Sequence, residues 1–123
     1  MATVADRRVR HALAYIHAHL TEPLSFDAIA AAAATSPFHL ARCFRSAVGC
    51  TIWQYVLRER ARHAATLIRH GRRELSQIAS DSGFETYASF VSAVRRVFGV
   101  APAALRASTG SRHARRSRIS TQA

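Results

Sequence analysis

The sequence lacks several features that mark whole classes of protein. It has no lysine, only two cysteines, and no apolar run of the roughly 18 residues that a membrane span needs. Cys43 and Cys50 are too few for a disulfide scaffold or a four-ligand zinc site. The first ten residues, MATVADRRVR, hold no apolar stretch of the kind that a secretory signal requires. We therefore expect a cytoplasmic protein without a membrane segment.

Basic charge is what the sequence has in excess. Eighteen arginines stand against seven acidic residues, so the net charge is +11 with neutral histidines. Such a balance in a small domain makes a polyanion the first candidate partner. Residues 107–123 hold four of the arginines, no acid and one isoleucine, so we expect a disordered basic tail there. This tail is either a solvated terminus without a role or an arm attracted to phosphates.

Apolar residues recur at helical spacing along the chain, and no stretch alternates with the period of a strand. With 25 alanines and 49% hydrophobic residues, the chain favours helices around a buried core. We predict an all-α fold without a sheet. Its seven helices are expected at residues 4–20, 26–33, 37–48, 51–70, 75–82, 87–98 and 102–105.

The two halves of the chain repeat one pattern. Ser25–Ala30 precedes Glu74–Ala79 by 49 residues, and Leu40–Arg45 precedes Phe90–Arg95 by 50. Each half is a short helix, a tight turn and a longer helix, which together make a helix-turn-helix. We predict one domain over residues 1–106, with the first helix-turn-helix at 25–49, a long linker helix at 51–70 and the second at 74–99.

Residues typical of helix ends mark both units. Ser25 and Ser36 stand where N-cap residues are expected, and Gly49 and Gly99 stand where a left-handed residue ends a helix. Glu74 takes the place that Ser25 has in the first unit, so we expect a weaker cap there.

Paired helix-turn-helix units favour double-stranded DNA as the polyanion. The longer helix of each unit has the dimensions to enter a major groove. Two such helices held about 34 Å apart would read successive grooves on one side of the duplex, and a closer spacing would require bent DNA.

The residues also resemble a known family. From Ala30 to Gly49 the chain reads A-x-x-A-A-T-S-P-F-H-L-x-R-x-F-R-x-x-x-G, and Ile78 to Pro102 carries a matching second signature. Both are similar to the DNA-binding domain of the AraC/XylS family, over about residues 5–106. The resemblance implies a sequence-specific regulator of transcription, usually an activator that works with RNA polymerase. It also implies either a single-domain form of the MarA/SoxS type that binds DNA as a monomer, or an excised domain that a missing sensor domain would dimerise.

Three positions of the first longer helix are expected to read bases. The family resemblance assigns this role to Phe38, Ala41 and Arg42. A guanidinium can pair with guanine O6 and N7, and a Phe ring can contact a thymine methyl group. The turn before this helix departs from the family at Ala34, where a left-handed conformation would cost about 1–2 kcal/mol.

The second longer helix presents a different set of candidate base contacts. They are Tyr87, Ala88, Val91 and Ser92. Many family members carry a long polar residue at the position of Ser92. This helix is therefore expected either to read shape and methyl groups more than hydrogen bonds, or to contact mostly the DNA backbone. We hypothesise that the first unit carries most of the base specificity.

Contacts to the DNA backbone are expected from helix N-termini and from arginines further along. Each arginine has the alternative of a simple solvated charge. Arg60 is different, because the family pattern places it in the core, paired with Asp81 or Glu85. The candidate backbone contacts are Ser36, Pro37, Arg45, Thr86, Arg95, Arg96, Arg58 and Arg62, with Arg69 on the same side of the linker helix.

The sequence also bears on functions other than transcriptional regulation. The sequence has no paired-carboxylate site, no glycine-rich phosphate loop and no C-x-x-C, so we expect no enzyme, no cofactor and no metal site. A thiol sensor that uses Cys43 or Cys50 is one alternative. A nucleoid-type protein that packages DNA without reading its sequence is the other, since it needs only the charge.

Overall fold

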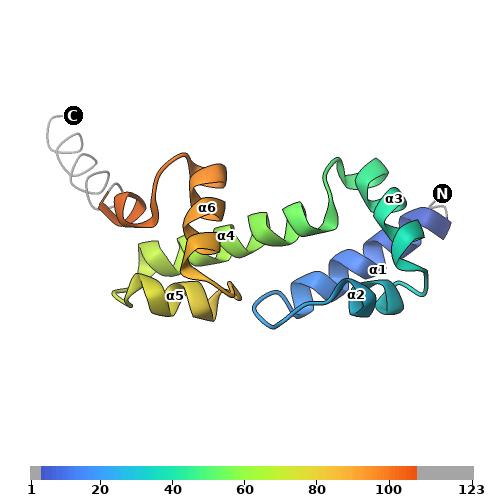
Figure 1. Cartoon of the computed structure of the whole chain (residues 1–123), viewed down its shortest axis with the longest axis horizontal. Helices are drawn as coiled ribbons and strands as arrows, with labels where there is room; N and C mark the ends of the chain where they lie inside the picture. Colours follow the sequence, from blue (N-terminus) through green and yellow to red (C-terminus); the bar gives the residue numbers. More distant parts are fainter. Residues whose placement is uncertain (1–3, 108–123) are drawn as a thin grey trace, which may run out of the picture. The chain divides into compact units, whose positions relative to one another are not determined.

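The computed structural model describes residues 4–107, and all of its regular structure is helical (Figure 1). No strand occurs among these residues. The six longer helices are α1 (Val4–Ala18), α2 (Phe26–Ala32), α3 (Pro37–Val48), α4 (Ile52–His70), α5 (Leu75–Asp81) and α6 (Tyr87–Phe98). Residues 102–107 form a seventh helical stretch. The all-α prediction is confirmed, while the expected basic tail lies outside the described residues apart from its first position.

The chain divides into two compact units, Met1–Arg60 and Ala61–Ala123. The boundary falls inside α4, so the helix expected as a linker contributes its first half to one unit and its second half to the other. The first unit contains α2 and α3, and the second contains α5 and α6. Each unit therefore holds one helix-turn-helix of the repeat.

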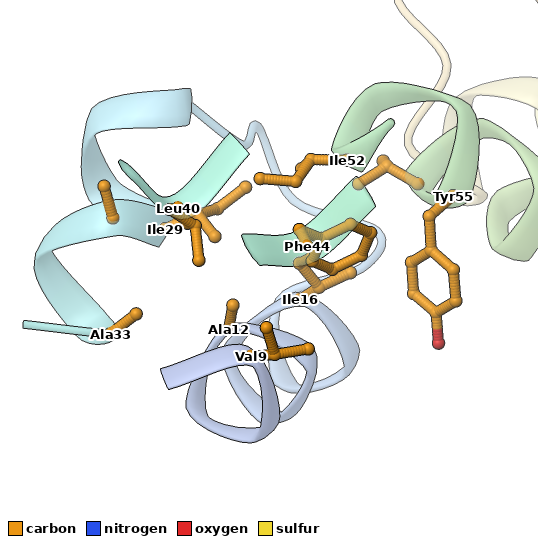
Figure 2. Close-up of a cluster of buried hydrophobic side chains, with 11 residues drawn as sticks. Val9, Ala12, Ile16, Ile29, Ala33, Leu40, Phe44, Ile52 and Tyr55 are labelled. Carbon is orange, nitrogen blue, oxygen red and sulfur yellow. The ribbon is translucent and has the colours of Figure 1, made fainter. Parts of the chain in front are cut away.

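The core of the first unit is built from side chains of four helices, α1, α2, α3 and the start of α4 (Figure 2). Helix α1 packs against both α2 and α3. The rings of Phe44 and Tyr55 meet edge to face, with centroids 5.6 Å apart, which is a favourable aromatic arrangement. The buried cluster consists of Val9, Ala12, Ile16, Ile29, Ala30, Ala33, Leu40, Phe44, Ile52, Tyr55 and Val56. These side chains fix α3 with one face inward and the other free.

The turn between α2 and α3 is left-handed at a residue that has a side chain. Ala34 has φ 55°, as expected from its place in the turn. Ser36 then caps α3, because its Oγ accepts a hydrogen bond from the His39 N–H at 3.2 Å. The left-handed Gly49 ends the helix, as predicted. The sharp turn thus carries backbone strain of about 1–2 kcal/mol.

The second unit has the same helix-turn-helix design, with one weaker helix cap. The Oγ1 of Thr86 accepts from the Ser89 N–H at 3.1 Å at the start of α6, and Gly99 ends that helix in the left-handed region. Glu74 makes no side-chain hydrogen bond at the start of α5, so the prediction of a weaker cap is confirmed. Inside the unit, the rings of Phe84 and Phe90 pack edge to face at 5.6 Å.

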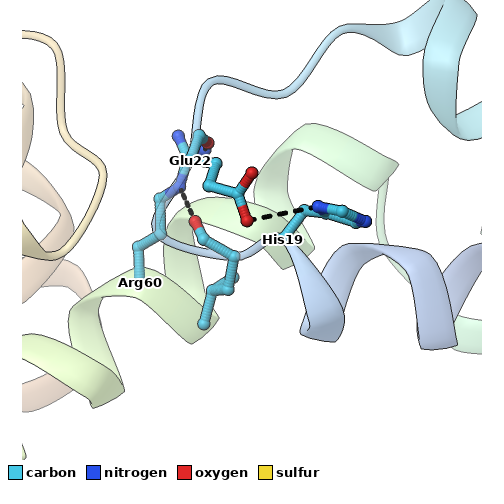
Figure 3. Close-up of polar contacts among 4 residues, drawn as sticks. His19, Glu22 and Arg60 are labelled. Carbon is cyan, nitrogen blue, oxygen red and sulfur yellow. Dashed lines mark hydrogen bonds and ion pairs between the residues drawn. The ribbon is translucent and has the colours of Figure 1, made fainter.

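Arg60 is buried, with 3% of its surface exposed, as the sequence predicts. Its Nε donates to the carbonyl oxygen of Leu20 at 2.8 Å, and its Nη2 donates to the carbonyl oxygen of Glu22 at 2.9 Å (Figure 3). The guanidinium thus ties the segment between α1 and α2 to α4. The sequence predicts a carboxylate partner for Arg60, either Asp81 or Glu85. Asp81 accepts hydrogen bonds from Arg73 at 2.7 Å and from Gln77 at 2.9 Å within the second unit.

Candidate nucleic-acid interface

The free face of α3 combines an apolar ring with a cation. Phe38 is 75% exposed, and Arg42 and Arg45 are exposed beside it, with Ala41 half-buried. The opposite face is fully buried through Leu40 and Phe44. A helix that is anchored on one side in this way offers its other side as a rigid surface. The structure therefore brings the three expected base contacts of the first unit together on one face.

Phe38 and Arg42 also touch each other. The guanidinium carbon of Arg42 lies 5.9 Å from the centroid of the Phe38 ring, within the range of a cation–π interaction. The two residues are one helical turn apart. Arg42 is therefore held near the aromatic ring, on the same exposed face.

The free face of α6 is less charged at the matching positions. Tyr87 is 47% exposed, Ala88 and Ser92 are exposed, and Val91 is half-buried. The Tyr87 ring leans on Phe90, with centroids 5.4 Å apart. Since Ser92 stands 50 residues after Arg42, this face offers hydroxyl and apolar groups where α3 offers a guanidinium.

The N-termini of α3 and α6 are suited to contact with a phosphate group. Ser36 and Thr86 already accept a hydrogen bond from their own helix, which leaves their hydroxyl hydrogens available to donate. Pro37 occupies the first turn of α3, where its missing N–H costs nothing. Arg45, Arg95 and Arg96 follow in the last turns, and all three are exposed.

The candidate arginines of α4 differ from one another. Arg58 is half-buried, its guanidinium carbon lies 5.1 Å from the Tyr55 ring centroid, and its Nε lies 3.8 Å from a Glu59 carboxylate oxygen. Arg62 and Arg69 are exposed, and the Arg69 guanidinium lies 5.3 Å from the Phe98 ring. The Arg58 guanidinium is thus engaged within its own unit.

A groove beside α3 was not anticipated from the sequence. It has a volume of about 560 Å³ and opens between the N-terminal part of α1 and α3. The Cys43 thiol lies 3.5 Å from Nε2 of His39 in its wall. The signal in the sequence was the stripe at positions 39, 43, 46 and 47, whose spacing places them on one side of a helix. The lining residues are Asp6, Val9, His39, Arg42, Cys43, Ser46 and Ala47.

Among residues with described positions, no three His, Cys, Asp or Glu side chains lie close enough to hold a metal ion. None of the described helices is both long and apolar enough to cross a membrane. Cys43 and Cys50 are both free and half-buried.

Two capped helix-turn-helix units with free recognition faces define a DNA-binding protein of the helix-turn-helix class. Residues 29–108 match the family model described as a helix-turn-helix domain. The chain is 30% identical to the regulatory protein SoxS of Escherichia coli strain K12 over 94 residues, which is 76% of this chain and 88% of SoxS. It therefore belongs to the AraC family of DNA-binding transcriptional regulators, which are not enzymes.

Two further comparisons agree with this assignment. The chain is 36% identical over 88 residues to the probable transcriptional regulator LumQ of Photobacterium leiognathi, covering 72% of this chain and 36% of LumQ. The DNA-binding domain of the transcriptional factor AdpA, solved in complex with a target DNA, matches with TM-score 0.80 and 28% identity. That match covers 85% of this chain and 95% of the AdpA domain. The chain spans about a third of the length of several curated relatives that it matches.

Proposed function

We propose that this chain binds promoter DNA in a sequence-specific way, with α3 and α6 inserted into successive major grooves. The observation that carries the proposal is the exposed Phe38 and Arg42 pair, on a helix whose other face is fully buried. A rigid face that presents a guanidinium and a ring suits the edges of base pairs. The AdpA domain, which is similar in fold, was solved with its target DNA.

In this proposal the two units have different tasks. Arg42 of α3 supplies the main hydrogen-bonding contact to a base, and Phe38 and Ala41 add apolar contacts. Tyr87, Ala88, Val91 and Ser92 of α6 read shape and methyl groups. The backbone is held by Ser36, Pro37, Arg45, Thr86, Arg95, Arg96 and Arg62, with a smaller share for Arg58 because its guanidinium is engaged with Tyr55.

The proposal extends to the setting in which the chain works. A regulator of this family acts on chromosomal DNA, so we place it in the cytoplasm in association with the nucleoid. We propose that it binds as a monomer, because two different units in one chain can fill two half-sites without a second copy. We also propose that it activates transcription through contact with RNA polymerase, as the family resemblance implies.

Selection of bound sites from random duplex DNA tests the central claim. The full chain is incubated with a randomised duplex library, and the bound fraction is sequenced after several rounds. We expect one enriched site with two half-sites about one helical turn apart, the spacing of successive major grooves. Equal affinity for random DNA would contradict the proposal and favour the nucleoid-packaging alternative.

A further inference from the structure

Phe38 is the most exposed large apolar side chain among the described residues. Its 75% exposure compares with 47% for Tyr87 and 43% for Trp53. A phenylalanine ring has no hydrogen-bonding atom, so it cannot recognise the donors and acceptors of a base edge. What it can recognise in a major groove is an apolar group. The one such group on the ordinary base edges is the C5 methyl of thymine.

Arg42 indicates which base lies next to the one that carries the methyl group. Its guanidinium carbon lies 5.9 Å from the Phe38 ring centroid. In a major groove the two side chains would therefore face adjoining base pairs. A guanidinium pairs best with O6 and N7 of guanine. Together the two side chains match a pyrimidine carrying a C5 methyl group next to a guanine.

Thymine is not the only pyrimidine with this methyl group. Enzymatic methylation of cytosine places a methyl at C5, where it projects into the major groove at the same position. A contact made by Phe38 alone cannot tell the two bases apart, because it does not involve the groups at C4 that distinguish them. Arg42 does not separate them either, since its partner is the neighbouring guanine.

We propose that α3 reads the C5 methyl group of a pyrimidine beside a guanine. It therefore accepts either thymine or 5-methylcytosine at that position and discriminates against unmethylated cytosine. This inference rests on the proposed function, and it adds that cytosine methylation regulates binding. Helix α6 lacks this pair of a ring and a guanidinium, because the residues matching Phe38 and Arg42 are Ala88 and Ser92.

The test uses the full chain together with the DNA site that the selection from random DNA enriches. At each pyrimidine of the half-site assigned to α3, four duplexes carry thymine, uracil, cytosine or 5-methylcytosine. The first two differ by one methyl group in an A·T pair, and the last two differ by it in a G·C pair. Affinity is measured by fluorescence anisotropy. At one position we expect the methyl group to tighten binding about fourfold in both pairs, equivalent to ~0.8 kcal/mol for one buried methyl group.

Variants assign the effect to Phe38. In Phe38→Ala the methyl-bearing and methyl-free duplexes should bind equally, whereas Phe38→Leu should retain a smaller difference. Trp53→Ala is the matched control, because it removes an exposed ring of α4 that is not among the expected DNA contacts, and it should leave the effect unchanged. Phe38 is exposed, so the fold of Phe38→Ala can be verified by an unchanged circular dichroism spectrum and melting temperature.

The possible failures can be told apart. A methyl effect that survives in Phe38→Ala overturns the inference, as does its absence at every pyrimidine of that half-site in the unmodified chain. In both cases specific binding, and with it the proposed function, still stands. Failure of the selection to enrich any site would overturn the proposed function and this inference together.

Discussion

The side chain of Arg60 in α4 donates to the carbonyl oxygen of Leu20 at 2.8 Å, across 40 positions of the chain. With the second bond to Glu22, this contact fixes the segment that joins α1 to α2. The position of α2, which packs against α3, depends on that segment. A residue remote from the recognition face thus contributes to holding the first unit in its folded form.

Replacement of Arg60 by methionine should destabilise the first unit. Methionine keeps an unbranched apolar stem but loses both charge-assisted hydrogen bonds, each worth about 1.5–3 kcal/mol. We expect a loss of roughly 2–4 kcal/mol in the free energy of unfolding, measured by urea denaturation. Arg10→Met, at an exposed position of α1, is the control and should change stability by less than about 0.5 kcal/mol. A similar loss in both variants would contradict the role assigned to Arg60.

Replacement of Ala34 by glycine should stabilise the protein. Ala34 has φ 55°, and glycine adopts this conformation without the clash of a Cβ atom. We expect a gain of about 0.5–1 kcal/mol, because part of the strain relief is offset by the greater freedom of glycine in the unfolded chain. Ala31→Gly is the matched control. Ala31 is exposed within α2, so glycine there should cost about 1 kcal/mol. The thermal midpoints of the two variants should move in opposite directions.

The sequence predicts most of this fold because local signals agree with the tertiary structure. Tyr87–Phe98 is helical over the predicted range, since Thr86 and Gly99 mark its ends. The periodic pattern predicts that the first helix ends at residue 20, but α1 ends at Ala18. The final apolar residue of the periodic pattern, Leu20, is half-buried from the following turn. The periodic pattern of apolar residues indicates which side chains are buried. It does not distinguish a helix from a turn that packs on the same core.

The candidate site was predictable in its residue positions and less so in its contacts. The outward direction of Phe38 and Arg42 follows from the inward direction of Leu40 and Phe44. The partners of Arg60 could not be identified, because main-chain carbonyl groups are present at every residue and leave no mark in a sequence. The contact between Arg58 and the Tyr55 ring was likewise hidden, since positions three apart on a helix are neighbours whether or not they interact.

Arg42 and Arg45 should differ in what they contribute to DNA binding. Residues 25–49 carry a net charge of only +1, so we do not expect the first helix-turn-helix to bind DNA by charge alone. Arg42→Ala should relax the preference for one base by about 1–3 kcal/mol. Arg45→Ala should weaken all sequences alike and reduce the salt dependence by about one phosphate contact. Anisotropy titrations of specific and random duplexes at several salt concentrations separate the two effects. Equal loss of base preference in both variants would show that the α3 face is assigned wrongly.

A bulky group on Cys43 should interfere with DNA binding, whereas one on Cys50 should not. Cys43 shares its groove with Arg42, while Cys50 follows α3 and is absent from the groove lining. In Cys50→Ser only Cys43 can react with N-ethylmaleimide, and we expect affinity for the selected site to fall roughly tenfold, or about 1.4 kcal/mol. Cys43→Ser carries the same reagent at Cys50 and should bind as before. Mass spectrometry confirms that each thiol has reacted. Equal affinity of both alkylated variants would show that a group in the groove does not obstruct the DNA-binding face of α3. It would also remove the steric basis for a sensor at Cys43.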